Sequence, residues 1–320
     1  MEVIVQSPLD SVMQEESHRM YKRILVALDG SQLAEQVLPY STVLAKGLGA
    51  KLVLFRAYNP IPDAAYPPSG AAWDRMAALI KQDAEEYLAA NAKTLMSAGL
   101  DVSTSAAFGY PAQQILDEAQ RQPNTLIVLS THGRSGIVRG VLGSVADRVL
   151  RTGSGPVFLV KSRQRAPQSV KLDAVIATLD GSKLAEKVLP QVVGLAKPLR
   201  LKVVLLSINE HPRLAIATDG IPTSPNERTF QELEACARDY LAKIAANIRG
   251  QGVTNIEERV TQGLAAHVIS DTARFDPNAF VAMTTHGRSG IGRWLLGSVV
   301  DRVVRESNSP VLVIRAADKR

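Results

Sequence analysis

Residues 131–145 are THGRSGIVRGVLGSV, and residues 285–299 are THGRSGIGRWLLGSV. A second pair of matching segments lies earlier in the chain, LVALDGSQLAEQVLPY at 25–40 and IATLDGSKLAEKVLPQ at 176–191, where ten of sixteen residues are identical. Both pairs occur in the same order and at nearly the same spacing. The chain is therefore a tandem duplication with a domain-sized period.

The duplication divides the 320-residue chain into two domains, in line with a typical domain size of about 150 residues. Between the copies, KSRQRAPQSVK is polar and contains a proline, as is typical of a linker. We expect an N-terminal extension at 1–20, a first domain at 21–161, a linker at 162–170 and a second domain at 171–316.

Each copy alternates short apolar runs with helical patterns. The runs of the first copy are RILVAL (23–28), KLVLFRAY (51–58), DVSTSAAF (101–108), TLIVLS (125–130) and PVFLVK (156–161), and those of the second are AVIATL, KVVLLSI, NIEERVT, AFVAMT and PVLVIR. Helices are expected between the first-copy runs, from Ser31 to about Leu48, about Ala72 to Ala98, Pro111 to Arg121 and Gly143 onward. This alternation predicts an α/β fold with a mostly parallel sheet covered by helices on both faces.

Composition excludes several classes of protein. The net charge is +6, but basic residues are interleaved with acidic ones and form no run of five, so nucleic acid is not an expected partner. The single cysteine, Cys236, excludes an intramolecular disulfide and lies in a helical pattern, where we expect a small core residue. Residues 1–19 lack the features of a signal peptide and no long apolar run occurs, so we expect a cytoplasmic protein with no membrane partner.

Two segments of each copy follow strands at the edge where parallel sheets bind ligands. One begins with Asp29 or Asp180, and the other runs from the fourth strand into the glycine-rich stretch. Nine residues separate Gly133 from Gly143, and nine separate Gly287 from Gly297.

The second glycine of each pair precedes a serine, Ser144 or Ser298, with an aspartate three residues later. This capping-box spacing predicts that each serine begins a helix. The N–H groups and dipole of a helix N-terminus suit a phosphate, and Arg134 and Arg288 would add positive charge.

Other interpretations of these residues stay open. Each loop can be a plain connection in which the glycines make turns and the serine caps a helix, and Asp29 can form an Asx-turn instead of contacting a ribose hydroxyl, an adenine edge or magnesium. His132 and His286 suggest catalysis, but no Ser or Asp partner stands at triad spacing, so we interpret them as shaping the loop.

A strand ending in Asp-Gly-Ser, a fourth strand running into xxxG-9x-G-[ST] and a final strand of PVLVI type together resemble the universal stress protein family in its tandem two-domain form, over about residues 21–316. The resemblance implies two flavodoxin-like (Rossmann-like) domains with strand order 3-2-1-4-5 that bind ATP, with Mg²⁺ held by the phosphates and Asp29 or Asp180. The implied nucleotide-binding residues are Ala27, Asp29, Ala57, Ser130, His132, Gly133, Arg134, Gly143, Ser144 and Val145, and in the second copy Thr178, Asp180, Ile208, Thr284, His286, Gly287, Arg288, Gly297, Ser298 and Val299.

Within that set the resemblance implies separate tasks. Ala57 and Ile208 would lie against the adenine, and Val145 and Val299 would offer backbone N–H groups to phosphate. The sequence departs from the family pattern at the first motif glycine, which is Ser130 in one copy and Thr284 in the other. A small hydroxyl side chain there predicts adjusted binding, with a hydrogen bond to a sugar hydroxyl, and not its loss.

The leading hypothesis is an ATP-binding stress-response regulator. The alternatives are an interaction scaffold without nucleotide and a slow ATPase or self-phosphorylating protein, but the sequence offers no general base and no GxxxxGK[ST] lysine, so turnover is not expected. We expect the fifth strands to pair within one chain, because each would otherwise be an exposed apolar edge, and two chains can then associate as a homodimer. The proline-rich loops at 59–70 and 211–226 differ between copies and are where the two sites would diverge.

Overall fold

A computed structural model describes residues 20–59, 70–133, 141–164, 169–210, 215–216, 222–223, 227–286 and 296–315. The elements of the first copy are β1 (Arg23–Ala27), α2 (Gln32–Glu35), α3 (Leu38–Leu48), β2 (Lys51–Tyr58), α4 (Ala71–Ser97), β3 (Val102–Phe108), α5 (Pro111–Gln120), β4 (Thr125–Ser130), α6 (Ser144–Thr152) and β5 (Val157–Val160). Those of the second are β6 (Ala174–Thr178), α7 (Lys183–Glu186), α8 (Leu189–Leu199), β7 (Lys202–Asn209), β8 (Ala215–Ile216), β9 (Pro222–Thr223), α9 (Glu227–Gly250), β10 (Ile256–Gln262), α10 (Ala265–Phe275), β11 (Ala279–Thr284), α11 (Ser298–Glu306) and β12 (Val311–Ile314).

Each copy forms five parallel strands in the order 3-2-1-4-5. The first copy is ordered β3-β2-β1-β4-β5, and the second β10-β7-β6-β11-β12. The strand order reverses beside the first strand of each copy, which opens a crevice between the loops that follow β1 and β4. The predicted α/β fold class is confirmed, with two tandem domains of this order.

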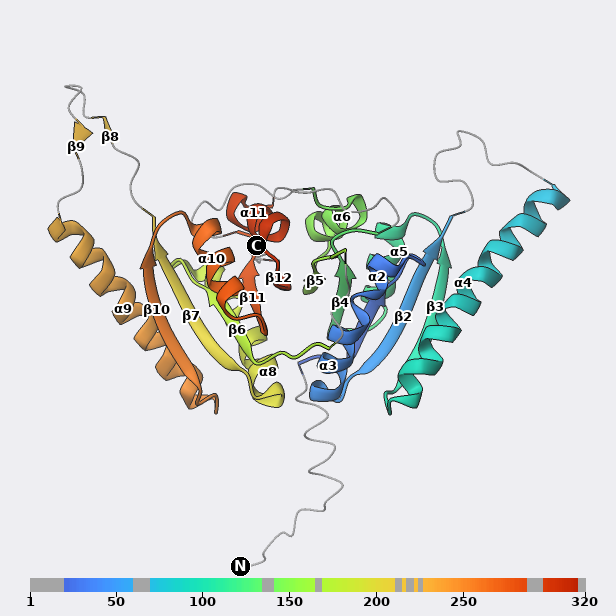
Figure 1. Ribbon diagram of the computed structural model, residues 1–320, viewed down its shortest axis with the longest axis horizontal. Helices are drawn as coiled ribbons and strands as arrows, with labels where there is room; N and C mark the ends of the chain where they lie inside the picture. The colour runs from blue at the N-terminus through green and yellow to red at the C-terminus, as the bar shows by residue number, and fades with distance from the viewer. Residues whose placement is uncertain are drawn as a thin grey trace, which may run out of the picture.

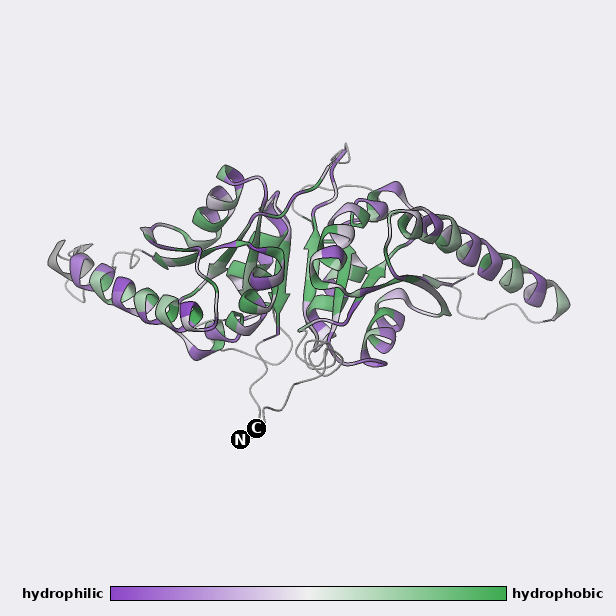
Figure 2. Ribbon diagram, turned by 90° about the horizontal axis from the view of Figure 1, so that it is seen from below, coloured by the Kyte–Doolittle hydropathy of each residue, from purple (hydrophilic) through white to green (hydrophobic). Residues whose placement is uncertain are grey.

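Helices cover both faces of the sheet, as Figure 1 shows. Alternate residues of β1 point to opposite faces, so that Ile24 packs in one core with α3 and α4, and Leu25 packs in the other with α5 and α6. Figure 2 shows the consequence, with hydrophobic strands at the centre and more hydrophilic helices outside. Strands buried on both faces explain why β4 reads as a continuous apolar run, since all six of its residues are buried.

The last strands of the two copies lie side by side. β5 and β12 pair antiparallel, with Phe158 opposite Leu312, so the ten strands form one sheet (Figure 1). The Phe158 ring also packs edge-on against Phe280, with 5.4 Å between ring centroids. Neither strand is therefore left with an unpaired apolar edge in this chain. Association of two chains stays a prediction, for which sedimentation of the purified protein is the measurement.

Charged side chains join α6 to α11 above this junction. Within each helix an arginine pairs with an aspartate, Arg151 with Asp147 at 2.9 Å and Arg305 with Asp301 at 2.8 Å. Across the two helices Arg151 lies 3.8 Å from Asp301, and Arg305 lies 3.9 Å from Asp147. The cluster holds the helices that follow the two glycine-rich stretches next to each other.

The first helix of each copy is interrupted, so the prediction of one helix from Ser31 to about Leu48 is wrong. α2 ends at Glu35 and α3 begins at Leu38, with Pro39 in its first turn. Proline has no N–H to donate to the carbonyl of Glu35, and its ring would collide with that carbonyl, so a continuous helix cannot form. Pro190 has the same effect between α7 and α8.

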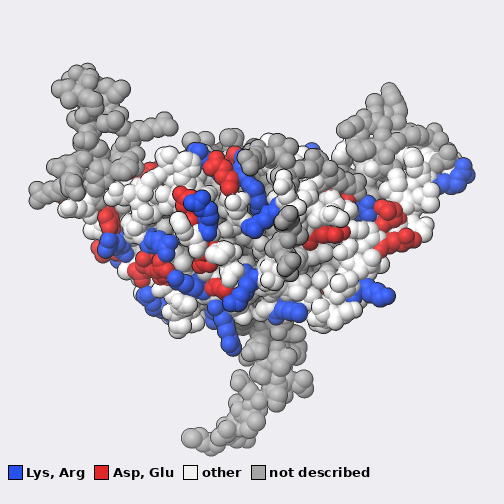
Figure 3. Space-filling model, viewed as in Figure 1, with Lys and Arg blue, Asp and Glu red and all other residues white. Residues whose placement is uncertain are grey.

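The surface corrects a second expectation. Cys236 is exposed, although the helical pattern predicted a core position. On the face in Figure 3, basic and acidic side chains are interspersed. Glu257 illustrates their pairing, because ion pairs with Lys202 and then Arg259 lower the pKa of its carboxyl. In the described part of the chain, every helix is too short or too polar to cross a bilayer.

Candidate functional site

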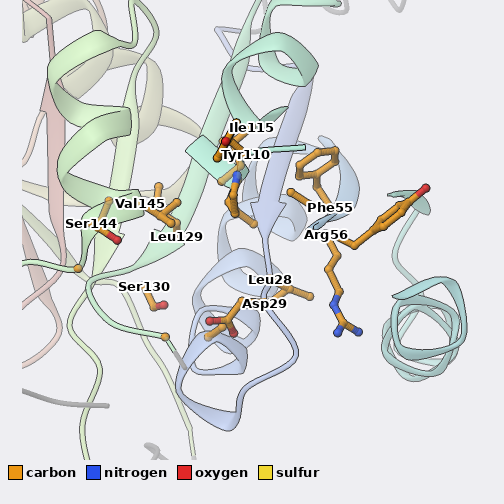
Figure 4. Close-up of a pocket in the computed structure, with 18 of the residues that line it drawn as sticks. Leu28, Asp29, Phe55, Arg56, Tyr110, Ile115, Leu129, Ser130, Ser144 and Val145 are labelled. Carbon is orange, nitrogen blue, oxygen red and sulfur yellow. The ribbon is translucent and has the colours of Figure 1, made fainter. Parts of the chain in front are cut away.

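A cavity of about 560 Å³ lies at the carboxyl ends of the first copy's strands (Figure 4). A cavity of about 370 Å³ occupies the corresponding place in the second copy. The first is lined by Ala27, Asp29, Ala57, Ser130, His132, Gly133, Gly143, Ser144 and Val145, and the second by Thr178, Asp180, Ile208, Thr284, His286, Gly297, Ser298 and Val299. Arg134, Gly287 and Arg288 lie outside the described residues. Sequence positions about a hundred residues apart thus meet at the two crevices.

Asp29 joins the first loop to the second. One carboxylate oxygen, Oδ1, accepts hydrogen bonds from the backbone N–H of Ser31 at 2.9 Å and from its hydroxyl at 2.6 Å. The other oxygen faces Gly133, where an added β-carbon would lie only 2.0 Å away. Asp180 makes the same two bonds with Ser182. The Asx-turn therefore forms, and in the first copy a β-carbon at residue 133 would force the Asp29 carboxylate to move.

The second glycine of each loop is required by a close contact with the chain itself. The Gly143 N–H donates to the carbonyl of Thr131 at 2.8 Å, and a β-carbon on Gly143 would lie 2.8 Å from that oxygen. Gly297 makes the same contact with Thr285. Gly143 has a φ of −57°, which any residue can adopt, so the close contact and not the backbone angle requires glycine there.

These contacts also place the helix starts. Gly143 and Gly297 are the N-cap residues, while Ser144 and Ser298 are the first helical residues and form no side-chain cap, which corrects the capping-box interpretation. The N–H groups of a first helical turn have no acceptor within the helix. They open onto the cavity beside Ser144 and Val145, where the positive end of the dipole favours an anion.

A Gly143→Ala substitution tests the contact with Thr131. We expect it to lower the free energy of unfolding by about 1–3 kcal/mol, because the new methyl group forces the helix start away from the strand end. Urea denaturation measures the change. Gly155→Ala is the control, since a β-carbon there meets no atom within 4 Å. Equal effects of both substitutions would contradict the close-contact explanation.

Ser130 and Thr284 stand where the family motif has its first glycine. The Ser130 hydroxyl donates to the carbonyl of His132 at 2.6 Å, and the Thr284 hydroxyl donates to that of His286 at 2.8 Å. Each hydroxyl hydrogen is thus used to close the turn after the fourth strand. Only the oxygen lone pairs remain to accept a hydrogen bond from a ligand.

The two histidines make the same local contact. Nδ1 of His132 lies 3.0 Å from the hydroxyl of Thr131, and Nδ1 of His286 lies 3.2 Å from that of Thr285. The Nε2 atom of each ring is buried and has no hydrogen-bond partner within the described residues. Both rings therefore help to form the turn, in the manner of loop-shaping residues.

The first cavity includes residues that sequence reasoning missed, among them Arg56, Tyr58, Asp83 and Tyr110. The Arg56 guanidinium is buried, pairs with Asp83 at 2.9 Å and lies 5.1 Å from the ring centroid of Tyr87. Burial raises the pKa of Tyr87, against which the charge of Arg56 acts. Their place in the sequence could have indicated them, because Tyr58 ends the second strand and Tyr110 follows the third, at the edge of the sheet where ligands bind.

Two doubly wound α/β halves, each with a cavity at its switch point, place the chain among tandem flavodoxin-like proteins. The model of the universal stress protein family matches residues 20–161 and 172–315. The chain belongs to the universal stress protein family, as the sequence resemblance predicted.

Relatives cover both a single copy and the whole chain. A universal stress protein of Methanocaldococcus jannaschii is 29% identical over 157 residues, which is 49% of this chain and 91% of that protein. One from Mycobacterium tuberculosis is 23% identical over 305 residues, which is 91% of this chain and 96% of that protein. A crystal structure of a universal stress protein from Archaeoglobus fulgidus has a TM-score of 0.69 at 19% identity and covers 92% of this chain and 99% of its own, which shows the shared fold.

Proposed function

We propose that each domain binds an adenine nucleotide, ATP with Mg²⁺, and that the occupied state regulates a stress response. One observation carries the proposal: in both copies a helix N-terminus, a carboxylate and an apolar wall face the same cavity. The three features match the triphosphate, ribose and base of a nucleotide. Both cavities also fall in the range of about 300–1,000 Å³ that is usual for small-molecule sites.

Each part of the site has a task in this proposal. Backbone N–H groups at Ser144 and Val145 bind phosphate, and Asp29 lies between them and the apolar wall at Ala57, where it can accept from ribose. Carboxylate oxygens suit Mg²⁺, which usually binds one or two carboxylates together with substrate phosphates, so Asp29 fits the ion. Asp180 and Ser298 take the same tasks in the second domain.

The double variant Ser144→Glu and Ser298→Glu tests the phosphate site. Both serines are exposed, and glutamate in a first helical turn interacts favourably with the dipole, so the fold should persist. Its charge would occupy the phosphate position. We expect ATP affinity in equilibrium dialysis with Mg²⁺ to fall about ten- to a hundredfold, since each tenfold is about 1.4 kcal/mol and repulsion at short range can exceed that.

The matched control is Ser144→Gln with Ser298→Gln, which adds the same bulk without charge and should retain ATP within about threefold. Equal ATP retention by the wild type and the glutamate variant would refute the proposed site. No retention by the wild type would favour the interaction scaffold. Phosphate release by the wild type above that of the glutamate variant would show turnover at the same site.

A further inference from the structure

The two cavities differ in volume and in the residues that line them. The first is about half as large again as the second. It continues past the end of β2, where its wall includes Arg56, Tyr58, Ile80, Asp83 and Tyr110. Among the described residues, α9 contributes nothing to the wall of the second cavity, whereas α4 contributes Ile80 and Asp83 to the first.

Aromatic rings gather at this extension. Tyr58 and Phe108 are partners in the β2–β3 register, and their rings pack edge-on with centroids 6.0 Å apart. Tyr110 follows two residues later and is 67% exposed, while Phe108 is 56% exposed. An exposed aromatic ring beside an apolar cavity leaves a large contact surface uncovered, and such rings stack readily on planar groups.

The second domain lacks these rings. Asn209 and Gln262 are register partners at the place of Tyr58 and Phe108. Leu264 follows Gly263 and precedes α10, just as Tyr110 follows Gly109 and precedes α5. The second site therefore keeps the carboxylate and the helix start, but among the described residues it has no tyrosine or phenylalanine ring at these positions.

Arg56 adds a polar group to the same extension. It is only 7% exposed, and its Nε–H has no hydrogen-bond partner among the described residues. The charge of Arg56 pairs with Asp83 of α4 in the same cavity wall. Ser207 takes the corresponding place in the second domain. It follows Leu206, the last β7 residue that pairs with β6, just as Arg56 follows Phe55, the last β2 residue that pairs with β1.

We propose that the two sites recognise different parts of the nucleotide. The first site selects a planar base, through stacking on Tyr110 beside Tyr58, and the second site binds the triphosphate with little contribution from the base. This inference rests on the proposed nucleotide binding. It makes Tyr110 a specificity-determining residue and the two domains unequal sensors.

Exchange of one residue between the copies tests the inference. The full-length chain is titrated calorimetrically with ATP and with inorganic triphosphate. In the first background Ser298→Glu blocks the second site, so that only the first site can bind, and in the second background Ser144→Glu blocks the first site, so that only the second can bind. Adding Tyr110→Leu to the first background should weaken ATP about tenfold, as loss of one base–aromatic stack does, and leave triphosphate unchanged. Adding Leu264→Tyr to the second should tighten ATP and leave triphosphate unchanged.

Because Tyr110 is exposed, its replacement should leave the fold intact, and an unchanged triphosphate affinity would confirm that the site is formed. Equal ATP affinities with and without Tyr110→Leu would overturn the inference while leaving the proposed function standing. So would a parallel loss of ATP and triphosphate affinity. Absence of ATP binding in both backgrounds and in the wild type would overturn the proposed function, and the inference with it.

Discussion

Replacing Glu118 with alanine is expected to lower the free energy of unfolding by about 3–5 kcal/mol, because it leaves a buried guanidinium without its counter-ion. The Glu118 carboxylate on α5 pairs with Arg23 of β1, and both side chains are about 6–7% exposed. Arg121 lies 2.7 Å from the same carboxylate, and Ser105 donates to it at 3.2 Å. One substitution therefore breaks a connection among a helix and two strands.

Urea denaturation provides the measurement, and two variants separate charge from packing. The double substitution Arg23→Met with Glu118→Leu removes both buried charges and should cost less than Glu118→Ala alone, since the only charge that loses its partner is Arg121, whose side chain is 67% exposed. Glu258→Ala breaks an exposed pair with Arg249 and should change stability by less than about 1 kcal/mol. A double variant as unstable as the single one would contradict the ion-pair explanation.

Phe158→Ala is expected to cost about 3–5 kcal/mol, the usual range for deleting a buried phenyl ring. The ring is fully buried, lies between Phe280 and Tyr40, and belongs to the strand that pairs with β12. Its removal opens a cavity where the two copies meet. We expect the thermal transition to broaden or split as the halves lose cooperativity, which calorimetry would detect.

Phe275→Ala is the matched control, because that ring is 80% exposed and its loss should change stability by less than about 0.5 kcal/mol. Equal costs at the two positions would argue against the junction of β5 and β12 in solution. The comparison therefore also tests the prediction that the fifth strands pair within one chain.

Local patterns in the sequence were sufficient for much of the fold. Apolar runs marked the strands because strands covered on both faces bury every side chain, as in β4. The repeated segments indicated two copies, and the family resemblance implied the strand order that the structure has. Periodicity did not reveal the break before Pro39 or the exposure of Cys236, since one depends on a missing N–H and the other on which helix face meets the sheet.

The candidate site divides in the same way. The spaced glycines and the aspartate after the first strand could be recognised in the sequence. Gly143, Gly297 and the two aspartates line the cavities. The reasons for the glycines were not visible, because the backbone carbonyl of Thr131 leaves no room for a side chain at Gly143, and a side chain at Gly133 would displace the carboxylate of Asp29. Those are contacts between loops brought together by the sheet.

By itself the sequence determined that two similar α/β domains exist, because hydrophobic periodicity and internal repetition are properties of neighbouring residues. Only the tertiary structure decided how the two domains differ. Arg56, Tyr58 and Tyr110 come from separate positions along the chain and converge at one cavity, while the corresponding residues of the second copy form no such wall. The physical reason is that a binding surface is made of side chains that meet at the ends of adjacent strands, and their meeting depends on the folded sheet.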